Sequence, residues 1–250
     1  MLNMVQANLF RLIRTRFSWA IPVALAAYGA LAPFLFWEKC RLCATFRQLL
    51  EQVALGEVVC AAAVFWLAVF FAEDFARATV RNLMAGPQSR LAYVGAALAT
   101  TLLWAIALLL LSVAALALGA AAAGCLPAQI DGAQLLLWAL MWGLLIAGFV
   151  MVALLAAMPW GSGAVTAAVL VAAALWTRAA YWFFAVAAQG LPAGAAQWVS
   201  DCLQPLLPTS LRIAISQGAP LEGWWFADAA AVVLVATVAI GTILRRKELR

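Results

Sequence analysis

The sequence contains no histidine and few charged residues. The absence of histidine excludes Ser–His nucleophile pairs, His-based zinc motifs and imidazole general bases. No Gly-x-x-x-x-Gly-Lys-Ser/Thr segment occurs, so the chain has no P-loop for a nucleotide. We therefore expect no ATP hydrolysis, no metal site and no cofactor in this chain.

Charged residues make up only 10% of the chain, whereas apolar residues make up 68% and the mean hydropathy is +1.04. A soluble domain typically carries about 25% charged and about 45–50% apolar residues. The composition therefore predicts an all-α integral membrane protein. The net charge of +5 is not gathered into a polar patch with interleaved aromatics, so we expect membrane lipid rather than nucleic acid as a partner.

Six apolar segments can cross a bilayer as helices, which takes about 20 residues each. They are residues 18–37, 56–72, 92–120, 133–157, 161–187 and 223–244. The third segment is longer than needed, so we expect it to tilt or to project from the membrane. The prediction is one transmembrane domain over residues 1–250, with no nucleotide-binding domain.

Basic residues indicate the orientation, because cytoplasmic loops are enriched in Lys and Arg. With six spans, both termini lie on one side of the membrane. Placing that side in the cytoplasm puts ten of the 15 basic residues there: Arg11, Arg14, Arg16, Arg77, Arg81, Arg90, Arg245, Arg246, Lys247 and Arg250. The outer side keeps Lys39, Arg41, Arg47 and Arg212, with Arg178 near the outer end of the fifth span. We expect a multi-pass plasma-membrane protein with cytoplasmic termini.

Residues 1–16 have the pattern of an amphipathic helix. The apolar residues recur at helical spacing (Leu2, Val5, Leu9, Leu12, Ile13), and the polar ones occupy the other face (Asn3, Gln6, Arg11, Arg14). We expect this helix to lie in the headgroup layer. The residues expected at the membrane interface are Arg11, Arg14, Arg16, Arg245, Arg246 and Lys247. The alternative is an unstructured basic tail.

Two outer connections are long enough to hold short helices. Residues 38–55 are expected to form an amphipathic helix after the first span, and residues 188–222 to form short helices on or in the membrane before the last span.

Four cysteines fall on the expected outer side: Cys40, Cys43, Cys125 and Cys202. Cys60 lies near the outer end of the second span. Cys40 can pair with Cys43, or either can pair with Cys125 or Cys202, and the sequence does not choose among these disulfides. The alternative is that the cysteines are small packing residues. One CxxC without a second CxxC or a histidine is a weak metal motif.

The connection between the second and third spans, FFAEDFARATVRNLMAGPQSRLAY at residues 70–93, is unusually charged for this chain. Its apolar and charged residues separate onto two sides at helical spacing. Glu73 and Asp74 come early and the arginines late, which suits the helix macrodipole. Gly86-Pro87 can end this helix and Ser89 can cap the next. The pattern predicts a short, capped, charged helix at the cytoplasmic mouth.

This connection resembles the corresponding part of ABC-2 type permeases, the membrane subunits of ATP-driven exporters. The matching segments are Glu73-Asp74, Ala78-Thr79-Val80-Arg81-Asn82-Leu83 and Gly86-Pro87-Gln88-Ser89-Arg90. NLFRLIRTRFSW at 8–19, the basic tail RRKELR, and six spans with a large outer loop before the last are also similar to that family. The chain departs from the family at three places. Ala78 stands where family members often have Gly, and no acidic residue lies near Asn8, where one is common. Residues 95–97 lack the Lys that family members often have early in the third span.

The resemblance implies a permease subunit that pairs with a second copy or a homologous permease and with separate ATPase subunits. The ATP and Mg would be bound by those partners. The 73–90 helix would then be the coupling helix, seated in a cleft of the nucleotide-binding subunit. The residues implicated are Glu73, Asp74, Arg77, Thr79, Arg81, Asn82, Leu83, Ser89 and Arg90. The resemblance also favours an amphipathic peptide antibiotic or drug as the substrate, moved for export or immunity.

Two other classes of membrane protein are alternatives to a permease subunit. An intramembrane enzyme has no histidine to activate Ser162, and Glu57 and Asp228 are its only candidate carboxylates. A non-ABC channel, ion carrier or assembly factor fits the composition but does not explain residues 73–90. Glu57, Arg178 and Asp228 are candidates for a substrate path, or else reach the outer interface.

Overall fold

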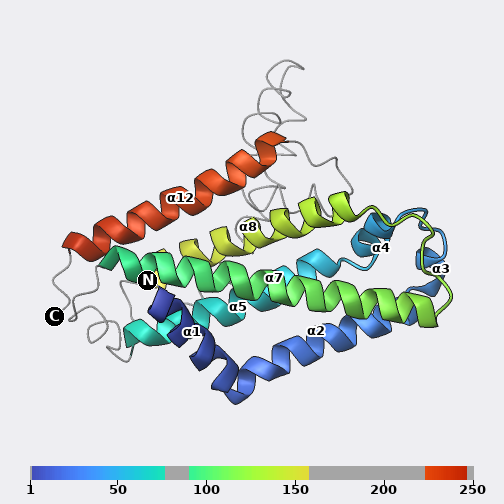
Figure 1. Cartoon of the computed structure of the whole chain (residues 1–250), viewed down its shortest axis with the longest axis horizontal. Coiled ribbons are helices and arrows are strands. Elements are labelled where there is room, and N and C mark those ends of the chain that lie inside the picture. The colour runs from blue at the N-terminus through green and yellow to red at the C-terminus, as the bar shows by residue number, and fades with distance from the viewer. Residues whose placement is uncertain (1, 77–89, 158–222, 247–250) are drawn as a thin grey trace, which may run out of the picture.

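The described part of the chain is built from helices (Figure 1). The structure is a computed structural model that describes residues 2–76, 90–157 and 223–246. Its helices are α1 (Leu2–Arg14), α2 (Arg16–Leu35), α3 (Trp37–Cys40), α4 (Phe46–Gln52), α5 (Leu55–Ala76), α7 (Arg90–Ala122), α8 (Gly132–Ala157) and α12 (Gly223–Arg246). No β-strand occurs within these three ranges, so the all-α prediction is confirmed there.

Four of these helices, α5, α7, α8 and α12, are long and apolar enough to cross a membrane. Helices α1 and α2 count as a fifth span if the pair, bent by 71°, is taken as one. The chain thus fits a multi-pass helical membrane protein. The bounds of these helices follow the predicted spans to within two residues, except that α5 runs to Ala76 rather than 72. The predicted span at 161–187 and the outer loop at 188–222 lie outside the described residues.

The long helices run side by side and bring chemically different segments to the two ends of the bundle (Figure 1). One end, called here the amino-terminal end, holds α1, the last turn of α5, the first turn of α7 and the last turn of α12. The opposite end, called the α3–α4 end, holds α3, α4 and the turn from α7 to α8. This grouping agrees with the predicted sidedness of the same segments.

Helices α2 and α7 approach closely because glycines face their contact. A Cβ atom built on Gly119 would lie 2.3 Å from the carbonyl oxygen of Ala30, and one on Gly29 would lie 2.8 Å from that of Ser112. At these distances only the hydrogen atom of a glycine, and no Cβ atom, fits at either position. Small residues let membrane helices gain van der Waals contact where lipid offers no hydrophobic drive to associate. Helix α7 also packs against α1, α5, α8 and α12, so it is the central helix.

Buried hydroxyl groups on α7 are satisfied within the helix itself. Thr100, Thr101 and Ser112 each donate a hydrogen bond to the carbonyl oxygen four residues earlier, at 2.7, 2.8 and 2.7 Å. In an apolar environment without water, a hydroxyl group that makes no hydrogen bond costs roughly 2–7 kcal/mol of free energy. These residues therefore sit inside the bundle without needing a partner from another helix.

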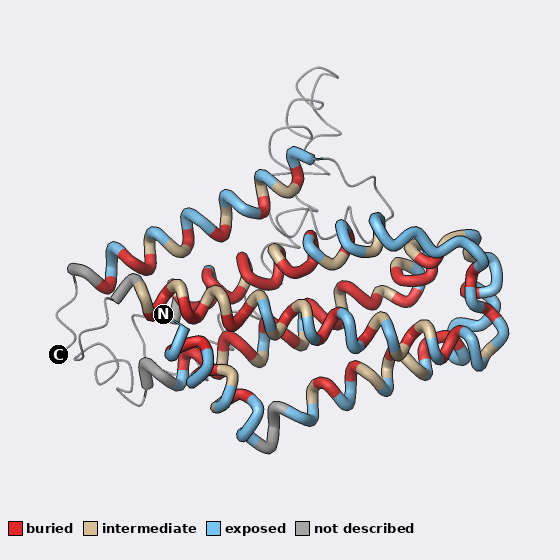
Figure 2. The backbone as a smooth tube through the Cα atoms, in the orientation of Figure 1, coloured by how far each residue is buried: buried red, intermediate tan, exposed pale blue. Residues whose placement is uncertain are grey.

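The outward faces of the long helices are exposed (Figure 2), and they carry many large apolar residues. Leu31 on α2, Leu118 on α7 and Leu234 on α12 are 57%, 73% and 65% exposed. Exposed apolar faces of this extent are expected where lipid covers the surface.

The connection after α2 confirms the predicted short amphipathic helix, although it is divided into α3 and α4. Helix α4 begins with a capping box in which the Thr45 hydroxyl accepts from the Gln48 N–H at 3.3 Å and the Gln48 Oε1 accepts from the Thr45 N–H at 3.3 Å. Its apolar face, with Phe46, Leu49 and Leu50, is buried.

Replacing Gly119 by Ala should loosen the α2–α7 contact, because the new methyl group meets the Ala30 backbone. We expect a loss of roughly 1–3 kcal/mol in unfolding free energy, read as a lower thermal midpoint of the purified protein by tryptophan fluorescence. The matched control is Gly143→Ala, whose Cβ would lie 3.8 Å from the nearest atom, Ile106 Cγ1. Equal midpoints for the two variants would contradict this packing.

Candidate functional site

The amino-terminal end of the bundle carries both ends of the charged connection. Helix α5 leads into it and ends at Ala76, and α7 leaves it from Arg90. Glu73 is exposed in the last turns of α5. Most of the predicted coupling residues lie outside the described residues: Arg77, Thr79, Arg81, Asn82, Leu83 and Ser89. The structure therefore places the two ends of this segment, and its predicted role stays a prediction.

The two acidic residues belong to a different helix from the one predicted. Glu73 and Asp74 were expected to open a separate helix, whereas α5 continues through both to Ala76. The apolar run alone set the predicted end at residue 72. A helix continues past the apolar run as long as its backbone hydrogen bonds are made, so hydropathy marks the membrane boundary and not the helix end.

Helix α1 packs against the bundle, mainly against α7 and also against α2. Its buried residues are Met4, Val5, Asn8 and Leu12. Of the predicted apolar face, Val5 and Leu12 are buried against the bundle, whereas Leu2 and Ile13 are 72% and 47% exposed. The face that packs against the bundle is rotated relative to the predicted apolar face, because one side of α1 rests on α7 and the other side faces outward (Figure 1). The 4, 8, 12 spacing was a signal for this face, but Asn8 hid it by being polar.

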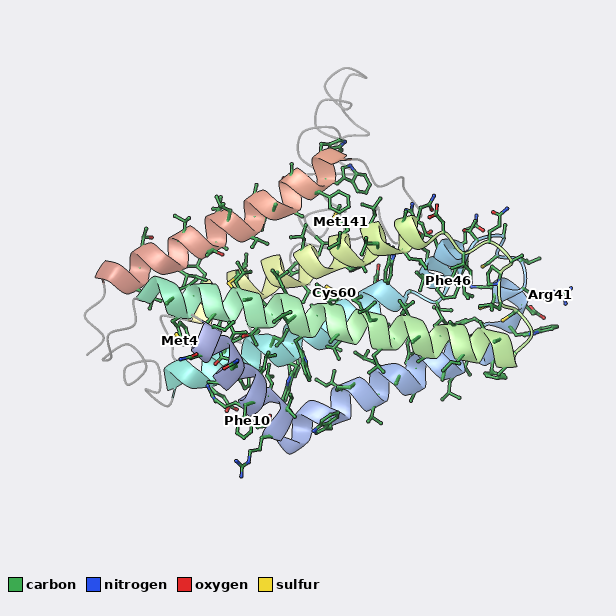
Figure 3. The ribbon with its side chains drawn as sticks, in the orientation of Figure 1. Met4, Phe10, Arg41, Phe46, Cys60 and Met141 are labelled. Carbon is green, nitrogen blue, oxygen red and sulfur yellow. The ribbon has the colours of Figure 1, made fainter. Side chains whose placement is uncertain are left out.

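An arginine of α1 also reaches α5. The Arg11 guanidinium lies 5.0 Å from the centre of the Phe70 ring, within the range of a cation–π contact. Phe70 is buried, so this contact lies against the bundle. Arg14 lies over Phe10 of its own helix at 5.6 Å, and Phe10 points away from the bundle (Figure 3). Arg11 was predicted only as a lipid contact, and its contact with α5 was missed.

The bend from α1 to α2 is held by hydrogen bonds. The Thr15 hydroxyl donates to the carbonyl oxygens of Arg11 and Leu12 at 3.1 and 3.0 Å, and the Trp19 indole N–H donates to that of Ile13 at 2.9 Å. These bonds give partners to carbonyls in the last turn of α1, where the helix itself no longer supplies all of them; the Arg11 carbonyl also accepts from the Thr15 N–H at 3.2 Å. Helix α1 is therefore fixed by its packed face, which contacts the bundle, and by the hydrogen bonds between its last turn and residues 15 and 19.

The remaining predicted interface residues are placed only in part. Arg16 begins α2, and Arg245 and Arg246 form the last residues of α12, at the same end of the bundle as α1. Lys247 lies outside the described residues. Contact of these residues with lipid stays a prediction.

Among the substrate-path candidates, Glu57 lines a small cavity at the α3–α4 end. The cavity is about 10 Å³ and is formed with Leu50, Glu51, Ala54, Gly56, Trp138 and Trp142. It has room for about one water molecule. The Trp142 indole N–H is buried there and has no hydrogen-bond partner among the described residues, so it is a donor for such a water.

A second carboxylate beside this cavity is already paired. Arg47 Nε donates to Glu51 Oε1 at 2.8 Å. Burial raises the pKa of Glu51, while the hydrogen bond and charge of Arg47 act in the opposite direction. Asp228, on α12, does not line this cavity, and Arg178 lies outside the described residues. The structure therefore does not gather the three substrate-path candidates around this cavity.

Three of the four predicted outer cysteines are described, and all three lie at the α3–α4 end. Cys40, Cys43 and Cys125 are free thiols, with Cys40 and Cys125 buried. Cys60 is a buried thiol in α5, and Cys202 lies outside the described residues. No group of three or more metal-ligating side chains is assembled in the ranges that the structure covers.

Comparison with known proteins does not assign the chain to a family. No protein-family model matches the sequence, and a search of curated proteins finds no match.

Removing the Phe70 ring should release α1 from α5. We expect Phe70→Leu to raise backbone hydrogen exchange over residues 2–14 by about tenfold, since a cation–π contact is worth roughly 0.5–2 kcal/mol and 1.4 kcal/mol is tenfold. Phe10→Leu is the matched control, because Phe10 is 61% exposed and contacts only Arg14 of its own helix in this way. Hydrogen exchange that rises equally in both variants would argue against an anchoring role for Phe70.

Proposed function

We propose that the chain is the permease subunit of an ATP-driven ABC exporter of the ABC-2 type. In this proposal, residues 73–90 are the surface through which a separate ATPase subunit moves the bundle. ATP and Mg are bound by that ATPase. A second permease copy, or a homologous permease, completes the translocation path, and the six predicted spans form its transmembrane domain.

The observation that carries the proposal is the packing of α1 at the amino-terminal end. Helix α1 rests on α7 and contacts α5 through Arg11, and these two helices are the ones that flank residues 77–89. A force applied to the connection would therefore act on three helices that are already in contact. A simple surface loop would not need such support.

The central position of α7 gives a route for that motion. With 33 residues and a rise of about 1.5 Å per residue, α7 is about 50 Å long and reaches the α3–α4 end. It packs against the four other long helices in the part of the chain that the structure describes, so a rigid-body shift begun at Arg90 would be transmitted to all of them.

The distribution of charge supports a cytoplasmic location for the amino-terminal end. At the amino-terminal end, the basic residues outnumber the two acids Glu73 and Asp74, with Arg11, Arg14, Arg16, Arg90, Arg245 and Arg246 in the helices there, whereas the α3–α4 end holds at least as many acids as bases, including the Arg47–Glu51 pair. We infer a plasma-membrane protein with both termini in the cytoplasm. The ATPase would then meet residues 73–90 where ATP is available.

The proposed substrate is an amphipathic peptide antibiotic or drug. The apolar helices offer a surface for its apolar face, in keeping with the resemblance of the sequence to ABC-2 permeases. A cavity for one water, such as that beside Glu57, cannot hold such a molecule. The substrate path would therefore form between two permease subunits rather than at this cavity.

The purified chain alone should hydrolyse no ATP, and ATP turnover should require a cognate ATP-binding-cassette subunit, found first among the neighbouring genes. Reversing the charge at Arg81 should abolish stimulated turnover and transport by the reconstituted complex, because the docking charge is lost. The assay is phosphate release in nanodiscs together with substrate transport in vesicles.

Lys39→Glu is the control for this variant, since Lys39 lies in α3 at the opposite end and reverses the same charge. It should leave turnover unchanged, and both variants should insert into the membrane normally. ATP turnover by the chain alone, or full activity of Arg81→Glu, would contradict the proposal.

A further inference from the structure

Two chain segments far apart in the sequence are held together at the α3–α4 end. The Trp37 indole N–H donates to the Ala123 carbonyl oxygen at 3.2 Å, and the Phe46 N–H donates to the Gln129 carbonyl oxygen at 3.0 Å. Thr45 and Gln129 also form an isolated parallel bridge. These contacts fix the α3–α4 segment against the turn from α7 to α8 on both sides of the cysteines.

The end of α7 directs Cys125 into this contact. The Cys125 N–H donates to the Ala120 carbonyl oxygen at 2.9 Å and the Gly124 N–H to that of Ala121 at 3.2 Å, which is the hydrogen-bond pattern of a Schellman cap. Gly124 has a φ of +68°, a conformation that glycine adopts without steric cost. Cys125 follows it and is buried, so the cap determines where this thiol lies.

Cys40 lies in the last turn of α3 and is fully buried. Its N–H donates to the Phe36 carbonyl oxygen at 2.9 Å, which fixes the backbone position. Cys40 and Cys125 are both buried at this end, on the two segments that the Trp37–Ala123 and Phe46–Gln129 hydrogen bonds hold together. A disulfide requires the two cysteine backbones to lie within several ångströms of each other, and the backbone contacts on both sides of Cys40 and Cys125 bring their segments together.

Cys43 lies near this pair but is directed differently. Its thiol donates to the Lys39 carbonyl oxygen at 3.5 Å, and it is less buried than the other two. Burial raises the pKa of the Cys40 thiol to about 11, with smaller contributions from Cys125 and Cys43. Burial also raises the pKa of Cys43.

We propose that Cys40 and Cys125 form a redox-dependent disulfide that ties the α2–α3 segment to the α7–α8 turn, and that Cys43 stays a thiol. Oxidation by an external disulfide joins the two sulfurs, and the two thiol protons and two electrons pass to the oxidant, which leaves as two thiols. A dithiol reductant reverses the reaction. Only the location of this end on the oxidising side of the membrane rests on the proposed function; the sulfur chemistry does not.

The bond would lock one end of the α2–α7 contact. Helix α2 leads into α3 and α7 leads into the turn that carries Cys125, so the disulfide covalently joins the two helices that approach through Gly29 and Gly119. Oxidation would thus restrain the α3–α4 end while leaving the amino-terminal end untouched.

The test is a count of protected thiols in the purified full-length chain in nanodiscs. The protein is equilibrated with oxidised glutathione, quenched with acid, unfolded and alkylated, and its intact mass is measured. The wild type has five cysteines. We expect three alkylated and two protected, and all five alkylated after reduction. Cys43→Ser should keep the protected pair and show two alkylated thiols.

Cys40→Ser and Cys125→Ser should each lose the protected pair and show four alkylated thiols. Trypsin cleaves after Arg41 and so separates Cys40 from Cys43, which identifies the cross-linked peptide directly. No protected pair in the wild type, a pair lost in Cys43→Ser, or a pair retained in Cys40→Ser would each overturn the assignment. None of these readouts depends on an ATPase, so this proposal can fail while the permease assignment stands.

Discussion

The close contact between α2 and α7 is the constraint on which the rest of the bundle depends. Gly29 and Gly119 leave no room for a side chain between the two backbones, so the helices meet at van der Waals distance. In a membrane, packing of this kind replaces the hydrophobic drive that holds a soluble core together. Because α7 also contacts α1, α5, α8 and α12, its position relative to α2 sets the frame for every other long helix.

This frame connects the two ends of the molecule. At the amino-terminal end, α1 holds α7 and reaches α5 through Arg11 and Phe70. At the α3–α4 end, the cap after α7 places Cys125 on a segment that hydrogen bonds hold to the segment of Cys40. A stiff central helix with defined contacts at both ends suits a protein that must carry a movement across a membrane. The proposed permease function gives that movement a source, and the proposed disulfide gives it a restraint.

The membrane helices could be predicted well from sequence, and the contacts between them could not. Hydropathy located α7, α8 and α12 closely, because the need to satisfy backbone groups in lipid leaves helix as the only solution for long apolar runs. The extension of α5 through Glu73 and Asp74 was missed because a helix can leave the membrane without ending. The packing of α1 on α7 was not predicted, because the face that it buries includes the polar Asn8 and is set by tertiary contact. The sequence left Cys40–Cys125 open as one of several disulfides, and only a turn and two long-range hydrogen bonds favour that proposed pairing.

In the proposed complex, an ATPase subunit binds this chain at the amino-terminal end. A photoreactive amino acid at position 73 tests it most directly, with position 38 as the matched site, since both replace exposed glutamates at opposite ends of the bundle. We predict cross-linking in intact cells from position 73 to a co-expressed ATP-binding-cassette subunit, and none from position 38. Cross-linking from position 38, or from neither position, would contradict it.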